Sequence, residues 1–216
     1  MSIRPILFNA EMVRANLDMR KTCTRRVIKG YIPKNAQWGY TAFTPDGCIS
    51  CRGIFKDGYG EKFFKLPYQK GDLLYVRETW KKAPNGYYYY EDWQRNDIAD
   101  ITKWKPSIHM PKEAARIWLK VMNVRVERLQ EMKPVDVIKE GAYPDCWDCL
   151  NTYGESGSQC CYGTEEQCSQ CDEVMMEWEK LWNSTIKKSD IDRYGWDANP
   201  WVWVIEFERC EKPEGA

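Results

Sequence analysis

The strongest strand signal in this chain is the stretch Ile117-Trp118-Leu119-Lys120-Val121-Met122-Asn123-Val124-Arg125-Val126. Alternate side chains of an extended chain point to opposite faces, and here both faces are partly apolar. Shorter strand-like segments occur on both sides of this stretch, at Pro5–Phe8, Thr22–Thr24, Leu73–Val76, Tyr87–Tyr90 and Trp201–Phe207. The chain is therefore expected to consist mainly of β-strands.

Three short helices are expected between these strands. Asn9 is a typical helix N-cap, and Glu11 follows in the first turn, where the helix dipole favours a carboxylate. Pro134 suits a first helical turn and Gly141 suits a helix end. Residues 174–182 carry apolar side chains at helical spacing. Several short strands with scattered helices predict an α+β, mainly β fold, and a small β-barrel rather than a doubly wound sheet.

The long connection between residues 30 and 70 is rich in Gly, Tyr, Phe and Pro. Its turn signals are Pro45-Asp46-Gly47 and Asp57-Gly58, so we expect one or two hairpins in this region. The 216 residues suit a single domain (1–216) with one inserted segment, residues 142–175.

Composition narrows the class of protein. Hydrophobic residues make up 43% of the chain and aromatic residues 14%, which supplies a core and argues against disorder. The 32 basic and 32 acidic residues cancel. A uniformly basic nucleic-acid-binding protein is therefore excluded, and any contact with nucleic acid needs a local patch.

The ten cysteines bear on the cellular compartment in which the protein is expected. Residues 1–12 contain no long apolar run, so we expect no secretory signal peptide. No stretch approaches the ~20 apolar residues of a membrane span. Cysteines without a secretory signal point to the reducing cytoplasm, where thiolates bind metals more often than they form disulfides. A disulfide framework is the alternative.

Two Cys-x-x-Cys pairs stand out within the inserted segment: Cys146 with Cys149, and Cys168 with Cys171. The 18 residues between the pairs match a four-thiolate zinc site, in which two tight turns complete one tetrahedron. Such a site is closed to water, so we expect Zn²⁺ to stabilise structure here rather than to take part in chemistry.

Other cysteines leave alternatives open. Cys160 or Cys161 could replace one member of the zinc set, or join Cys48 and Cys51 in a second metal site. An iron–sulfur cluster could use the same thiolates, but no redox-partner motif accompanies them. Cys23 and Cys210 are expected to be buried thiols.

The segment Arg20-Lys21-Thr22-Cys23-Thr24-Arg25-Arg26 is the main candidate for chemistry. Four of its seven residues are basic, and it lies where a helix is expected to pass into a strand. A lysine beside a threonine can act as a base when burial lowers its pKa. The alternative interpretation is a solvated basic edge.

This segment resembles the signature of ASCH domains, relatives of the PUA domain of RNA-modifying proteins. The family pattern is Leu-x-Gly-x-Lys-Thr-x-Thr-x-Arg, and the residues that match it are Leu17, Lys21, Thr22, Thr24 and Arg26. Met19 stands where the family has glycine. The segments Gly71–Trp80, Lys105–Pro111 with Ala115–Ile117, and Trp201–Phe207 are also similar to parts of this family, in particular to its phage- or prophage-encoded members.

The resemblance implies a PUA-like barrel whose cleft binds RNA or a modified nucleoside. Some small ASCH proteins are amidohydrolases that remove an acyl group from the exocyclic amine of cytidine. Carried over, their working residues are Lys21, Thr24 and Glu140. Lysine would take the threonine proton, threonine would attack the acyl carbon, and glutamate would orient the amine.

The same constellation suits binding without catalysis. Nucleic-acid binding is assigned to Arg25, Arg26, Arg77, Glu78 and Trp80. Arg26 and Arg77 would hold a phosphate, and Trp80 would stack on a base. An internal ion pair is the alternative for Glu78. The alternative function is a non-catalytic adaptor whose zinc-stabilised insertion binds a host protein.

Overall fold

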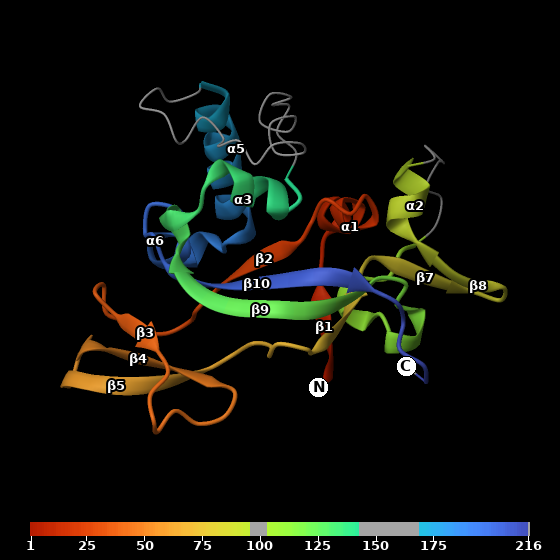
Figure 1. Cartoon of the computed structure of the whole chain (residues 1–216). Helices are drawn as coiled ribbons and strands as arrows, with labels where there is room; N and C mark the ends of the chain where they lie inside the picture. The colour runs from red at the N-terminus through yellow and green to blue at the C-terminus, as the bar shows by residue number, and fades with distance from the viewer. Residues whose placement is uncertain (96–102, 143–168, 216) are drawn as a thin grey trace, which may run out of the picture.

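The computed structural model describes residues 1–95, 103–142 and 169–215 (Figure 1). The protein is a mixed α+β structure with more strand (36%) than helix (27%), which confirms the predicted α+β, mainly β class. The predicted zinc ligands Cys146, Cys149 and Cys168 lie outside the described residues, as do Cys160 and Cys161.

The main sheet has five strands in the order β1-β6-β9-β10-β2. Their bounds are Ile3–Leu7 (β1), Leu73–Arg77 (β6), Trp118–Arg128 (β9), Trp201–Cys210 (β10) and Cys23–Val27 (β2). Strands β1 and β6 are parallel, and the other neighbours are antiparallel. The stretch that dominates the sequence pattern therefore forms the central strand β9.

This sheet does not close. Among the described strands, β1 and β2 remain its two edges, so the small closed barrel predicted from the sequence is not formed. A side chain joins the two edges instead. The Arg26 guanidinium on β2 donates a hydrogen bond to the Leu7 carbonyl on β1 at 3.1 Å and lies 6.0 Å from the Phe8 ring centroid.

Both faces of the sheet are covered, and β10 shows this most clearly. Trp203, Ile205 and Phe207 belong to a large core cluster with β1, β6 and helix α1 (Ala10–Leu17). Val202 and Val204 face the opposite way, into a cluster with α3 (Pro134–Lys139) and α5 (Ser169–Thr185). These two helices pack against each other over one face of the sheet (Figure 1).

Helix α1 forms where its capping signal predicted it. The Asn9 side chain accepts a hydrogen bond from the Met12 backbone N–H at 2.9 Å, which confirms the predicted N-cap. The helix ends at Leu17 with Asp18 as its C-cap. Met19 follows with a φ of +57°, a left-handed conformation in which side chains other than glycine are unfavourable.

The hairpin expected between residues 30 and 70 is present. Strands β4 (Cys48–Phe55) and β5 (Gly58–Lys65) pair with β3 (Gln37–Gly39) in a three-stranded sheet. Gly58 has a φ of +113°, as a tight turn requires. This second sheet lies at the opposite end of the molecule from α5 (Figure 1).

A third, two-stranded sheet consists of β7 (Trp80–Ala83) and β8 (Gly86–Tyr89), and α2 (Tyr90–Arg95) follows it. The remaining short helices are η1 (Ser107–His109), η2 (Lys112–Ala114), η3 (Leu129–Glu131), η5 (Lys188–Asp190) and α6 (Ile191–Tyr194). In the part of the chain that the structure describes, no helix is long and apolar enough to cross a membrane.

Candidate functional site

The segment with the ASCH-like signature is held between two helices. At its start, the Arg20 and Lys21 backbone N–H groups both donate to the Ala15 carbonyl of α1. The Thr22 N–H donates to the Lys139 carbonyl at the end of α3, at 2.8 Å. The segment then enters β2, the edge strand of the main sheet. These contacts bring the end of α3 against Lys21.

Lys21 and Glu140 form a buried ion pair. The Lys21 Nζ donates to Glu140 Oε2 at 2.9 Å and to the Glu140 backbone carbonyl at 2.6 Å. Their side chains are 0% and 2% exposed. Burial lowers the pKa of Lys21 below its ordinary value of 10.5, and the charge of Glu140 offsets only part of this effect. Lys21 therefore loses its proton at a lower pH than an exposed lysine does.

Arg25 holds the other oxygen of the same carboxylate. Its Nη1 donates to Glu140 Oε1 at 3.2 Å, and its Nε donates to Glu127 Oε1 at 2.8 Å. Asp136 lies 3.6 Å from its Nη2. Arg25 is buried among these three carboxylates, and its hydrogen bond holds Glu140 in place.

Gly141 allows α3 to approach this closely. Its φ is +83°, and a Cβ at this position would lie 2.4 Å from the Ala15 Cβ and 3.0 Å from the Lys21 Cβ. Any larger residue would push the end of α3, and Glu140 with it, away from Lys21.

A pocket of about 230 Å³ lies beside this network. Its polar lining includes Thr24, Arg25, Arg26 and Glu140. Its apolar lining comes from α1, β2, α5 and the segment after α5: Met12, Val27, Trp178, Leu181, Trp182 and Ile186. Lys21 itself does not line the pocket. It is connected to the pocket by its hydrogen bond to Glu140, which is one of the lining residues.

Three polar atoms on the lining residues are buried without a hydrogen-bond partner among the described residues. They are the Thr24 hydroxyl, the Trp178 indole N–H and Arg25 Nη2, of which the last lies 2.6 Å from Glu127 Oε1 in an ion pair. Buried polar groups are nearly always hydrogen-bonded, because leaving one unsatisfied costs about 1–3 kcal/mol. The Thr24 hydroxyl and the Trp178 N–H are therefore candidates for contact with a polar group of a ligand.

Arg26 also lines the pocket, and backbone carbonyls bind both of its terminal nitrogens. Its Nη2 donates to the Leu7 carbonyl and its Nη1 to the Arg25 carbonyl at 3.3 Å. Burial lowers its pKa from the ordinary arginine value. In this conformation Arg26 joins the sheet edges and does not offer the bidentate grip on phosphate that the sequence predicted.

Arg77, Glu78 and Trp80 lie away from this pocket, since none of them lines it. The Glu78 carboxylate is held by Arg116, with Nε and Nη2 at 2.9 and 2.8 Å. The ion-pair interpretation of Glu78 is therefore the one that the structure supports. Its partner Arg116 directly precedes the central strand and was not singled out in the sequence.

The other two members of this group are also engaged. Arg77 donates to the Ile108 carbonyl at 3.1 Å and to the Tyr75 hydroxyl at 3.3 Å. Trp80 is 5% exposed and packs 5.7 Å from Tyr87, between ring centroids. The Lys105 Nζ lies 5.1 Å from the centroid of its ring, so the described residues around Trp80 do not support stacking on a base.

The sequence did not identify Glu127 and Asp136, the other two carboxylates around Arg25, nor the place of Trp178 in the pocket wall. Glu127 ends an apolar strand, and its position in β9 was the one available signal, because a charge there needs a partner. Trp178 was recognised as an apolar position of a helix, and its pattern did not indicate a pocket wall.

The cysteines divide into three groups. Cys171 is in the first turn of α5, but the other predicted zinc ligands lie outside the described residues. Cys48 and Cys51 are three residues apart on β4, so their side chains point to opposite faces and are poorly placed to share a metal. Cys23 is buried, and burial raises its pKa to about 12, which makes it an unreactive thiol. No cluster of three metal-ligating side chains occurs among the described residues.

No protein-family model matches this chain, and no curated protein or solved structure is significantly similar to it. The resemblance to ASCH domains therefore depends on the short motifs quoted above. The chemistry of the pocket is the remaining guide to function.

Proposed function

We propose that this chain is a PUA-like ASCH protein that binds cytidine acylated on its exocyclic amine and hydrolyses the acyl group. The observation that carries the proposal is the Thr24 hydroxyl, which is buried without a hydrogen-bond partner among the described residues and lines the same pocket as Glu140, the ion-pair partner of Lys21. Covalent acyl transfer uses a nucleophile, here the Thr24 hydroxyl, and a general base of lowered pKa, here Lys21. A carboxylate, here Glu140, holds the general base in place.

The residues take the roles that the motif implies. Neutral Lys21 accepts the Thr24 proton, and Thr24 Oγ1 forms a bond to the acyl carbon. The C–N bond breaks, and the departing cytidine amine takes up a proton passed from Lys21 through Glu140. Water then cleaves the threonine ester and releases the carboxylic acid. Arg25 holds Glu140 in place throughout.

The dimensions of the pocket support a small ligand. Drug-sized ligands occupy clefts of about 300–1,000 Å³, so a pocket of about 230 Å³ suits a nucleoside rather than a stretch of RNA. The Trp178 and Trp182 rings offer apolar surface for the base or the acyl group. The Trp178 N–H offers a donor.

The test is turnover of acetylated cytidine, followed by its ultraviolet spectrum. We expect Thr24→Ala and Lys21→Met to lower kcat/KM by at least about 100-fold, because each removes a group that acts in the transition state. Thr22→Ala and Lys139→Met are matched controls, since Thr22 and Lys139 are exposed neighbours of the same types.

Two results would overturn the proposal. One is an absence of turnover by the unmodified chain at substrate concentrations that saturate binding. The other is a Thr24→Ala protein that is folded and as active as its Thr22→Ala control. Binding of the nucleoside without turnover would favour a reader of modified bases instead.

A further inference from the structure

The second sheet has an exposed face that the proposed function does not use. In the β4–β5 hairpin, directly paired residues share a face. Ile54 pairs with Tyr59, Arg52 with Glu61, and Cys48 with Lys65. Phe63 lies on the same face as Tyr59, four residues along β5. We call this the outer face of the second sheet.

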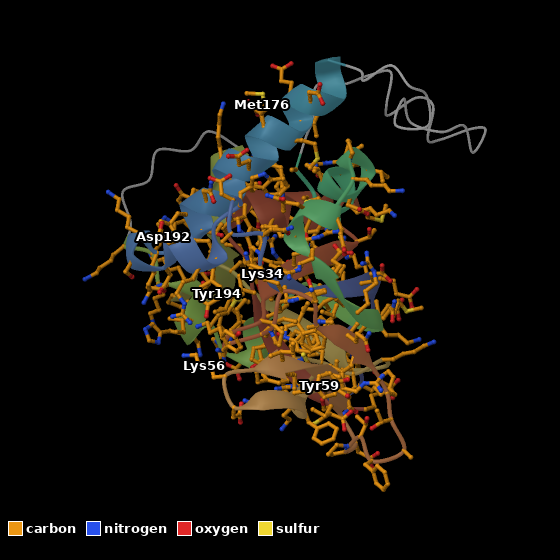
Figure 2. All side chains as sticks on the ribbon, turned by 90° about the vertical axis from the view of Figure 1, so that its left-hand side faces the viewer. Lys34, Lys56, Tyr59, Met176, Asp192 and Tyr194 are labelled. Atoms are coloured by element: carbon orange, nitrogen blue, oxygen red, sulfur yellow. The ribbon has the colours of Figure 1, made fainter. Side chains whose placement is uncertain are left out.

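The opposite face of the hairpin packs on the protein. Ile49 belongs to the large core cluster, and Trp38 and Phe64 pack against that cluster. The outer face is uncovered by the described residues: Ile54 is 70% exposed, Tyr59 76% and Phe63 42%. Figure 2 shows Tyr59 at the opposite end of the molecule from Met176 on α5, so the outer face is separate from the pocket.

Exposed aromatic rings of this kind indicate an interaction surface, because folded proteins seldom leave several of them together on one face. Two more exposed rings, Tyr40 and Phe43, occur in the loop that leads into β4. Tyr59 and Phe63 are about 13 Å apart along the strand at ~3.3 Å per residue, which leaves room for each ring to stack on a separate flat group.

The charge around these rings points to a polyanion. Residues 29–70 contain seven basic and three acidic residues, although the whole chain has no net charge. On the outer face itself, Arg52 and Lys65 flank the aromatic side chains. The acidic Glu61 on this face accepts a hydrogen bond from the Ser50 hydroxyl.

We propose that the outer face of the second sheet binds single-stranded nucleic acid, with bases stacking on Tyr59 and Phe63 and phosphates near Arg52 and Lys65. Rings interleaved with basic side chains on an open sheet are suited to this ligand, since every base offers a flat face. The neutral chain requires a local patch for any such contact, and residues 29–70, with seven basic and three acidic residues, carry a net charge of +4.

The experiment measures fluorescence anisotropy of a labelled oligouridine of about 10 nucleotides, a length within the footprints of small single-strand-binding folds. We expect Tyr59→Ala and Phe63→Ala each to weaken binding by roughly 5- to 150-fold. Lys65→Ala should weaken binding and reduce its dependence on salt. A duplex of the same length should bind less tightly.

The hairpin provides matched controls on its other face. Tyr31 is an exposed tyrosine that contacts Phe55, and Lys62 lies over the Phe55 ring. Tyr31→Ala and Lys62→Ala should bind like the unmodified chain. Acylcytidine turnover should not change in Tyr59→Ala, because Tyr59 is remote from the pocket.

Three outcomes would overturn the proposal. The first is no binding of the oligonucleotide at low salt. The second is equal loss of binding in the Tyr59→Ala and Tyr31→Ala proteins, which would indicate nonspecific attraction. The third is a mass that rises with protein concentration and falls to the monomer in Tyr59→Ala, which would make the outer face a contact between copies of the chain.

Discussion

Lys21, Arg25 and Glu140 form a buried charged group, and burying charges is costly unless they are paired and hydrogen-bonded. Here both Glu140 oxygens have a cationic donor, and Arg25 also contacts Glu127 and Asp136. Replacing such a group with apolar residues often leaves stability unchanged or improves it. Its presence next to a pocket therefore indicates function more than stability.

The lowered pKa of Lys21 predicts how activity depends on pH. If neutral Lys21 is the base, kcat/KM should rise with pH to a plateau, with a midpoint below 10.5. A pH–rate profile with acetylated cytidine measures this. A profile that shows no rise at any pH below 10.5, or one that falls as Lys21 loses its proton, would contradict the role of Lys21.

The same shift affects stability. Between the folded pKa of Lys21 and 10.5, the unfolded chain binds more protons than the folded chain, so the free energy of unfolding due to this group rises with pH. Urea unfolding at several pH values should show that Lys21→Met removes this contribution.

Met19 stores strain that a single substitution should release. It is 75% exposed and has a φ of +57° after the end of α1, where glycine is favoured. We expect Met19→Gly to raise the free energy of unfolding by about 1 kcal/mol. Met19→Ala keeps a Cβ in the left-handed conformation and should give no such gain, and equal effects of the two changes in urea unfolding would contradict this account.

At the scale of elements, the site depends on how α3 ends. The helix stops at Lys139, Glu140 caps it, and Gly141 turns the chain in a left-handed conformation. The Lys139 carbonyl accepts a hydrogen bond from the Thr22 N–H, directly before β2, and the Glu140 carboxylate accepts one from the Lys21 ammonium. One helix end therefore positions both the strand and the carboxylate.

Gly141→Ala should disrupt this arrangement. The added Cβ would clash with Ala15 and Lys21 at an unfavourable φ, so we expect a loss of about 2–4 kcal/mol in unfolding free energy, together with reduced turnover. Gly71→Ala is the matched control, because Gly71 has a φ of +87° and a Cβ there would meet open space among the described residues. Equal losses in the two proteins would assign the effect to φ alone.

At the scale of the whole molecule, the described residues form two separate surfaces. The pocket is lined by residues of α1, β2 and α5 together with Glu140, and the outer face belongs to the β4–β5 hairpin of the second sheet. The main sheet connects them, since Trp201 and Trp203 of β10 contact Trp38 of β3, with ring centroids 5.7 and 6.2 Å apart. These aromatic contacts lie between the pocket proposed for catalysis and the sheet proposed to bind single-stranded nucleic acid.

The inserted segment should contribute a metal to this molecule. We expect about one zinc ion per chain by elemental analysis, bound by Cys146, Cys149, Cys168 and Cys171. The double change Cys168→Ser, Cys171→Ser should remove the zinc and raise protease cleavage within residues 142–175. Cys48→Ser should retain the zinc, and a zinc-free unmodified protein would refute the site.

Local sequence patterns determined the elements of this protein. The Asn9 cap, the central strand, the Asp57-Gly58 turn and the helical spacing after residue 174 each depend on neighbours within a few residues, so they could be predicted without the fold. The motif around Lys21 likewise named Thr24, which lines the pocket, and the resemblance of residues 138–141 named Glu140, which pairs with Lys21.

Tertiary structure alone decided how these elements combine. Lys21 and Glu140 are 119 residues apart, and Arg25 and Glu127 are 102 apart, so their pairing follows from how α3 and β9 pack and not from any local pattern. The same holds for the open sheet that replaced the expected barrel, because strand closure depends on the relative position of β1 and β2. It also holds for Trp80, whose neighbours in space, not in sequence, bury its ring.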